Sequence, residues 1–143
     1  MPKKKTLQAL RKEALTTLQL MKRVEMADDN GYCTCVSCGV VRQWNDGMQG
    51  GHFVPKGKGG QNAWALVEDN VWPQCAGCNG FQMAYGKAAQ QYTTWMIDWK
   101  GREAVDEMLT TNPVIKYTRA DLEEKIYAWK EHIKFHKARL GVK

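Results

Sequence analysis

Apolar residues recur every three or four positions along two long stretches, one near each end of the chain. Between residue 5 and about residue 27 they are Leu7, Leu10, Ala14, Leu18, Met21 and Val24. In the second stretch they are Leu122, Ile126, Trp129, Ile133 and Leu140. This spacing places apolar side chains on one helix face, so the sequence predicts two amphipathic helices. Thr118, with Asp121 three positions later, matches a capping box at the start of the second.

The middle of the chain has a different pattern. Residues 32–79 contain all five cysteines and most of the glycines, and their apolar pieces are short, such as Val40-Val41 and His52-Phe53-Val54. Such pieces favour short strands in a small metal-binding unit. Helical spacing returns from about Asn79 to Trp99. A short helix with Val105, Met108 and Leu109 is expected after Gly101.

These patterns predict an α+β protein with a single domain over residues 1–143. We expect an N-terminal helix in residues 1–30, a cysteine-rich core in residues 31–99 and C-terminal helices in residues 100–143. No apolar run approaches the length of a membrane span, and the N-terminus does not resemble a signal peptide. We therefore expect an intracellular protein with no membrane partner.

Charge and cysteine content add two constraints. The formal net charge is +6, which favours a polyanionic partner because each neutralised phosphate releases counterions. Five cysteines, an odd number in a chain without an export signal, argue against a disulfide framework and favour metal binding.

Two Cys-x-x-Cys pairs, Cys35–Cys38 and Cys75–Cys78, have the spacing of a zinc site. Both thiolates of each pair can reach one ion, and two pairs complete the closed tetrahedral shell of structural Zn²⁺. Such a shell has no open position for chemistry. The alternative interpretation is four buried cysteines or a redox pair. Cys33 lies outside the pattern: it could replace Cys35, but it would make a poorer pair, and we interpret it as a free thiol.

Of the three histidines, only His52 lies between the cysteine pairs, where bound zinc would hold it near Asn79. His132 and His136 lie four residues apart among lysines of the C-terminal helix. That spacing could hold a metal, but no third ligand is evident near them, so we interpret them as solvated histidines or histidines at the edge of the apolar stripe.

The order of these motifs resembles the HNH, or ββα-metal, endonucleases in their His-Asn-Asn form. The matching residues are Cys35-x-x-Cys38, Gly51-His52-Phe53-Val54-Pro55, Asn70 and Cys75-x-x-Cys78-Asn79. Within that group the chain is most similar to the NinG, or Rap, recombination nucleases of lambdoid phages. That similarity includes Gly101-Arg-Glu-Ala-Val-Asp-Glu107 and spans roughly residues 32–135, although the long N-terminal region of the family is reduced here to one helix.

The resemblance implies a small zinc-held ββα-metal (HNH) core flanked by long N- and C-terminal helices. It also implies three roles: His52 as general base, Asn70 bracing the loop and orienting the histidine through its carbonyl, and Asn79 binding a catalytic Mg²⁺ or Mn²⁺. An imidazole suits the deprotonation of water near neutral pH, and a hard cation with oxygen ligands suits the scissile phosphate.

One position departs from the HNH pattern. Many of these enzymes have Asp or His directly before the base, as a second metal ligand, and this chain has Gly51. We expect water and DNA phosphate to complete the metal shell, or else Asp46, and after it Gln49, to replace that ligand.

Glycines around His52 would let a DNA backbone approach closely. Lys56 and Lys58 are the predicted phosphate contacts, and Arg42 and Lys87 are predicted to line the DNA path. Trp64 and Trp72, near the candidate site in sequence, either pack in the core or stack on an unpaired base.

The resemblance therefore implies a metal-dependent DNA endonuclease that cuts branched recombination intermediates, such as D-loops and Holliday junctions, in the cytoplasm of a phage-infected bacterium. Cutting a junction requires two symmetric nicks, which favours a homodimer. Two alternatives stay open: an HNH nicking or restriction-type endonuclease on duplex DNA, and a zinc-bearing DNA-binding module without catalysis.

Overall fold

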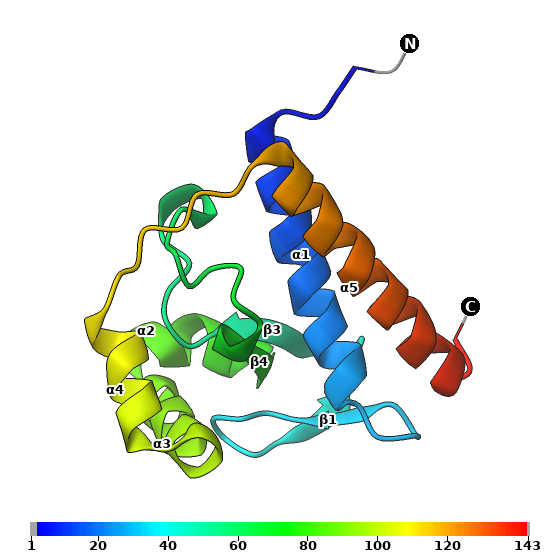
Figure 1. Ribbon diagram of the computed structural model, residues 1–143. Helices are drawn as coiled ribbons and strands as arrows, with labels where there is room; N and C mark the ends of the chain where they lie inside the picture. Colours follow the sequence, from blue (N-terminus) through cyan, green and yellow to red (C-terminus); the bar gives the residue numbers. More distant parts are fainter. Residues whose placement is uncertain (1–2, 143) are drawn as a thin grey trace.

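The computed structural model describes residues 3–142, and they form an α+β fold with two small antiparallel sheets (Figure 1). The strands are β1 (Tyr32–Thr34), β2 (Val41–Gln43), β3 (Met48–His52) and β4 (Val71–Cys75). The α-helices are α1 (Leu7–Met26), α2 (Met83–Tyr85), α3 (Ala88–Lys100), α4 (Arg102–Thr110) and α5 (Arg119–Arg139). Short helical turns are η1 (Lys58–Gly60), η2 (Glu68–Asn70) and η3 (Cys78–Gln82). No helix among these residues is both long enough and apolar enough to cross a membrane.

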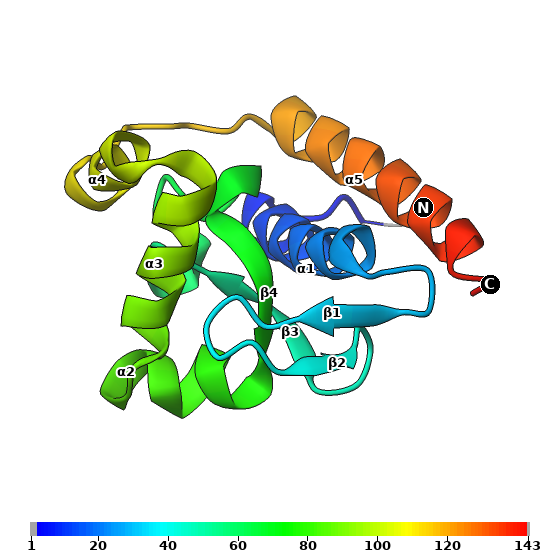
Figure 2. The ribbon, with the colours of Figure 1, turned by 90° about the horizontal axis from the view of Figure 1, so that it is seen from below.

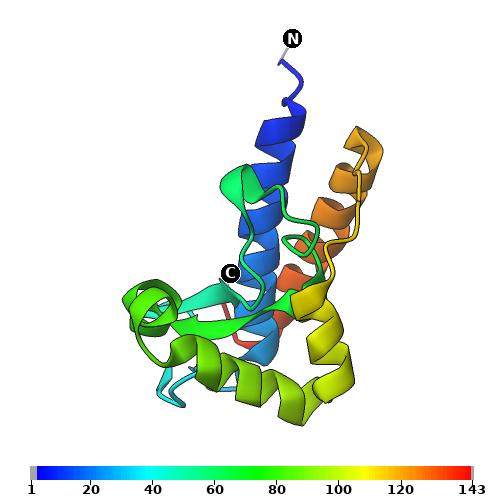
Figure 3. The same cartoon turned by 90° about the vertical axis from the view of Figure 1, so that its left-hand side faces the viewer.

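The two long helices form where periodicity predicts them, and they lie side by side, running in the same direction (Figures 1 and 3). The predicted capping box is present, since the Thr118 side chain accepts from the backbone N–H of Asp121 and the Asp121 carboxylate accepts from that of Thr118. The apolar stripes face each other, and their buried members are Leu10, Ala14, Leu18, Met21, Val24, Leu122, Ile126, Trp129 and Ile133. Leu7, at the first position of α1, is exposed.

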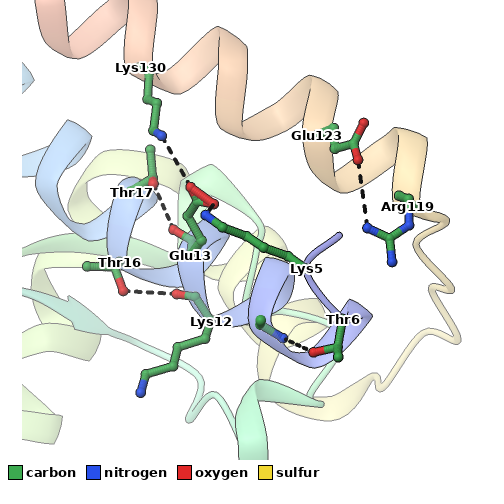
Figure 4. Close-up of polar contacts among 10 residues, drawn as sticks. Lys5, Thr6, Lys12, Glu13, Thr16, Thr17, Arg119, Glu123 and Lys130 are labelled. Carbon is green, nitrogen blue, oxygen red and sulfur yellow. Dashed lines mark hydrogen bonds and ion pairs between the residues drawn. The ribbon is translucent and has the colours of Figure 1, made fainter. Parts of the chain in front are cut away.

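Polar contacts fix the relative position of α1 and α5. The carboxylate of Glu13 on α1 pairs with Lys5 at 2.7 Å and with Lys130 on α5 at 3.2 Å (Figure 4). Near the other end, the Arg139 guanidinium donates to the carbonyl oxygens of Val24 (3.1 Å) and Ala27 (2.8 Å). These carbonyls belong to the end of α1, where no intrahelical donor is available, so α5 caps α1.

The β3–β4 pair lies between α1 on one side and the η3–α3 segment on the other (Figure 2). The register pairs Met48 with Cys75 and His52 with Val71. Successive residues of β3 face opposite sides, so a Cβ on Gly50 would lie 2.7 Å from the Cα of Gln19 in α1, whereas Gly51 faces away from α1. The close approach of α1 therefore depends on the missing side chain at residue 50.

Buried apolar residues form two clusters. One lies between α1, α5 and the strands, and the other between the loop after β3, α3 and α4; its members include Phe53, Trp72, Tyr92, Met96, Val105 and Met108. The buried Lys22 ammonium lies 3.5 Å from the Trp72 ring centre, which gives the charge a favourable contact inside the protein.

The structure corrects the predicted continuous helix from about Asn79 to Trp99. Gly80 (φ −103°, ψ −107°) and Gly86 (φ −116°, ψ −149°) are both non-helical, so the chain forms η3, then α2, and only then α3. Glycine adopts such angles at little cost, and two glycines six residues apart break the helix twice. The predicted short helix is present as α4, but Leu109 is exposed while Val105 and Met108 are buried.

We expect Gly50→Ala to lower the free energy of unfolding by about 1–3 kcal/mol, because the new methyl group would force β3 away from α1. Thermal and denaturant unfolding measure this change. The control is Gly77→Ala, whose backbone is helical (φ −64°) and whose Cβ would meet nothing within 4 Å. Equal unfolding midpoints for the two variants would contradict the packing of β3 on α1.

Candidate functional site

Four cysteines from two separate segments converge. Cys35 and Cys38 come from the loop between β1 and β2, and Cys75 and Cys78 from the end of β4 and the start of η3. Their four Sγ atoms lie within 4.8 Å of one another, and those of Cys38 and Cys75 are 3.8 Å apart. A tetrahedral zinc with Zn–S bonds of about 2.3 Å needs sulfur atoms about 3.8 Å apart. The cluster can therefore bind a structural metal such as zinc.

Cys33 is not part of this cluster. It is buried in the core, and its Sγ donates to the carbonyl oxygen of Arg23 at 3.1 Å. Burial raises the pKa of the Cys33 thiol to about 11, so it stays protonated at neutral pH. A protonated thiol in an apolar setting is unreactive and does not compete for the metal.

His52 and Asn79 line one pocket. The pocket has a volume of about 450 Å³ and is lined by Gln19, Gly50, His52, Pro55, Lys56, Asn79, Gly80, Met83 and Ala84. These residues come from α1, the end of β3, the loop that follows it, η3 and α2. The structure thus brings the candidate base, the candidate cation ligand and a candidate phosphate contact around the same hollow.

The half-buried His52 ring has a defined orientation, because its Nε2 lies 2.9 Å from the carbonyl oxygen of Ala65. A neutral imidazole that donates Nε2–H to this oxygen keeps a free lone pair on Nδ1. Burial lowers the pKa of His52 and the nearby Lys56 charge lowers it further, whereas the bond to Ala65 opposes the shift. His52 is therefore a neutral proton acceptor near pH 7.

The carbonyl of Asn70 does not orient His52 directly, although the resemblance implied that it would. Its backbone oxygen accepts from the N–H of Phe53, and the carbonyl that contacts His52 belongs to Ala65. The Asn70 side chain is fully buried: Oδ1 accepts from the Val54 N–H at 2.7 Å, and Nδ2 donates to the carbonyls of Val54 (2.9 Å) and Trp64 (3.0 Å). Asn70 thus braces the loop between β3 and β4, as expected, and orients His52 only through that loop.

Asn79 and Asp46 are placed differently with respect to the pocket. The Asn79 Nδ2 donates to Gln49 Oε1 at 2.8 Å, which leaves Asn79 Oδ1 free to bind a cation. Asp46 is exposed in the turn between β2 and β3, at the opposite end of β3 from His52, and does not line the pocket.

The candidate DNA contacts are all exposed but do not form one group. Lys56 lines the His52 pocket, and Lys58 begins η1 on the following loop. Lys87 precedes α3 and lines a second hollow, beside Cys38 and Cys78. Arg42 lies on β2, in the other sheet.

The aromatic residues also differ in exposure. Trp72 is buried, as the core interpretation requires, and the half-buried Trp64 donates its Nε1–H to the carbonyl of Thr111 at 3.1 Å. Phe81 and Tyr85 are instead the exposed aromatic pair after Asn79, with ring centres 5.2 Å apart. The periodicity of the sequence gives no sign of this pair, because the continuous helix that it predicts lacks the breaks at Gly80 and Gly86.

We expect Cys35→Ala to abolish stoichiometric zinc binding and to leave the purified protein largely unfolded. Structural zinc contributes roughly 10–16 kcal/mol in small zinc domains, comparable to the whole stability of a domain. Metal analysis and circular dichroism measure both effects. The control is Cys33→Ala, an equally buried thiol two residues away, which should keep one zinc per chain. Zinc retained by the Cys35 variant would contradict the site.

Comparison with protein-family models matches residues 2–138 to the family described as "Bacteriophage Lambda NinG protein". Neither the search of curated proteins nor that of solved structures finds a match. The family match extends from the first residues of the chain into the last turn of α5 and confirms the likeness to NinG that the motifs indicated. The chain therefore belongs to the bacteriophage lambda NinG family.

Proposed function

We propose that this protein is a metal-dependent DNA endonuclease of the HNH type that hydrolyses phosphodiester bonds in branched recombination DNA. The observation that carries the proposal is the pocket shared by His52 and Asn79. The order of elements around it also supports the proposal: two antiparallel strands, β3 and β4, are followed by a helical segment, and the cysteine cluster joins that segment to the β1–β2 loop.

In the proposed reaction, Nδ1 of His52 removes a proton from a water molecule, which attacks the scissile phosphorus. The new P–O bond forms as the bond to the leaving 3′-oxygen breaks, and that oxygen takes up a proton from solvent. The bond to Ala65 keeps the imidazole in the tautomer that this step requires. Mg²⁺ or Mn²⁺, held through Asn79 Oδ1, would supply charge stabilisation at the phosphate and the leaving oxygen.

The charge distribution supports a nucleic-acid substrate. Lys56 lies at the pocket that contains His52, and the exposed Lys58 and Lys87 extend positive charge along neighbouring segments. With a net charge of +6, binding should weaken steeply as salt increases. Arg42, on the other sheet, would contact DNA only if the substrate also passes that sheet.

Membership of a phage family related to recombination favours branched DNA over a linear duplex. The enzyme would act in the cytoplasm of the infected bacterium. Because a four-way junction is resolved by two symmetric nicks, we propose that the active form on junctions is a homodimer.

We expect His52→Ala to reduce metal-dependent cleavage of a synthetic Holliday junction by at least ~10²-fold while junction binding is retained, because only the proton acceptor is lost. Single-turnover cleavage with Mg²⁺ or Mn²⁺ and gel-shift titration measure the two properties. His132→Ala, on the exposed part of α5, is the matched control and should cleave normally.

Three outcomes would change the proposal. Unchanged cleavage by the His52 variant would remove the histidine from the mechanism. Equal cleavage of junction and matched linear duplex would indicate a nicking-type enzyme. Wild-type protein that binds DNA but cleaves neither substrate with either cation would indicate a non-catalytic zinc-bearing module.

The pKa of His52 should lie below the ordinary value of 6.5, because burial disfavours the imidazolium. Above that pKa His52 is almost entirely in its neutral, base form. NMR titration of the DNA-free protein should therefore show a pKa of His52 below 6.5. Because the unfolded chain binds the His52 proton more readily than the folded protein does, the burial of neutral His52 favours folding above about pH 6.5. As the pH falls below that value, the free energy of unfolding decreases. Lys56→Gln should raise the pKa of His52, since it removes a nearby positive charge. A pKa at or above 6.5 in wild type would contradict the buried setting.

A further inference from the structure

Gly51, the residue directly before His52, faces two side-chain oxygens. A Cβ added there would overlap Oε1 of Gln74 and would lie 3.0 Å from Oδ1 of Asn79. Gln74 is the last residue before Cys75, and Asn79 is the first residue after Cys78. The two amide oxygens therefore converge on one point from the two sides of the cysteine pair.

The orientation of the Gln74 amide follows from its neighbours. Gln74 is fully buried, and its Nε2 donates to Ser37 Oγ at 2.9 Å. The Ser37 hydroxyl donates its only hydrogen to the carbonyl oxygen of Ala88 at 2.8 Å, so it can only accept from Gln74. The amide nitrogen of Gln74 must face Ser37, and the oxygen must face Gly51.

The Gln74 oxygen has no hydrogen-bond donor among the described residues, although it is buried. Leaving a buried acceptor unpaired costs about 1–3 kcal/mol, and nearly all buried polar atoms in proteins are paired. An unpaired oxygen beside a second free oxygen, with no donor between them, is suited to a cation, since Mg²⁺ and Mn²⁺ take oxygen ligands.

We propose that Gln74 Oε1 and Asn79 Oδ1 together bind the divalent cation, so that Gln74 replaces the ligand that HNH enzymes place directly before the histidine. The inference rests on the proposed function in taking Asn79 as a cation ligand. It also explains Gly51: the ligand oxygen occupies the volume that a side chain at this position would need. Both oxygens lie beside the backbone of Gly51, each within 3.0 Å of the place that a Cβ would take, so one octahedral ion standing between them would contact both.

The two residues that the sequence offered for this role fit it less well. Asp46 lies in the turn before β3, at the opposite end of that strand from His52 and Gly51. Gln49 Oε1 already accepts the amide hydrogen of Asn79 at 2.8 Å. That bond turns Asn79 Oδ1 toward Gly51, so Gln49 is a positioning residue and Gln74 supplies the second ligand.

The test moves the second cation ligand from Gln74 on β4 to residue 51 on β3. Gln74→Ala and Asn79→Ala each remove one of the two oxygens, and Gly51→Ala displaces the Gln74 oxygen with a methyl group. In the double variant Gly51→Asp/Gln74→Ala, a carboxylate on β3 enters the volume that the glutamine leaves. The readout is Mn²⁺ binding to the zinc-loaded, DNA-free protein, followed by electron paramagnetic resonance and calorimetry. Zinc content and unfolding temperature are measured in parallel, and Gln8→Ala, on the exposed first turn of α1, is the control.

We expect each single variant to bind Mn²⁺ at least about tenfold more weakly than wild type. The double variant should recover wild-type affinity or exceed it, because a carboxylate replaces a neutral amide. The Gln8 control should bind normally. Cleavage of the junction should follow the Mn²⁺ affinities.

Other results would overturn the inference, and they separate it from the proposed function. If Gln74→Ala binds Mn²⁺ normally while Asn79→Ala does not, Gln74 is not a ligand and the rest of the site stands. If Asn79→Ala also binds normally, or if wild type binds no Mn²⁺, the cation site itself is wrong. If the single variants lose zinc or unfold, the double variant provides the test. A folded, zinc-loaded double variant that does not bind Mn²⁺ would refute the claim that Gln74 is the second cation ligand.

Discussion

The convergence of four sulfur atoms is the constraint on which the rest of the candidate site depends. The strands are three to five residues long, and the segment from Cys78 to Tyr85 is irregular, so neither has enough hydrogen bonding to fix its own position. The cysteine cluster anchors the β1–β2 loop to the end of β4 and the start of η3. Gln74 and Asn79 directly flank the anchored pair Cys75 and Cys78. The proposed site for a second cation is thereby built from residues whose neighbours are already held.

The long helices provide the second constraint on the site, because α1 packs against β3. Gly50 lets α1 pack directly on β3, and Gln19 of α1 reaches the pocket that contains His52. The opposite face of β3 presents Gly51 to Gln74 and Asn79. Two adjacent glycines thus serve two different neighbours, a helix backbone on one side and a pair of amide oxygens on the other. This arrangement gives the glycine-rich stretch before the histidine a physical explanation.

The sequence predicted those parts of the molecule that are encoded by local periodicity or by fixed spacing. Both long helices, the cap at Thr118, the four-cysteine cluster and the exclusion of Cys33 follow from such signals. The interruptions at Gly80 and Gly86 did not, because a single glycine is tolerated in many helices and only tertiary contacts decide whether it breaks one.

Contacts between distant residues were also beyond prediction. Nothing in the sequence distinguishes Ala65 as the partner of His52, since any carbonyl of the loop could have served. The orientation of Gln74 depends on Ser37 and Ala88, which are 37 and 14 residues away in the chain. Only their assembly in three dimensions leaves its oxygen without a donor among the residues that the structure describes.

The cap that Arg139 places on the end of α1 has a consequence for biosynthesis. Helix α1 completes the burial of its apolar face, and has its last carbonyls capped by Arg139, only when α5 has been made. About ninety residues separate Met26 from Arg119, which at ordinary translation speeds corresponds to a delay of roughly 5–20 s. During that interval the nascent chain exposes an amphipathic surface that a chaperone can recognise, and α1 and α5 pack together only after α5 has been made.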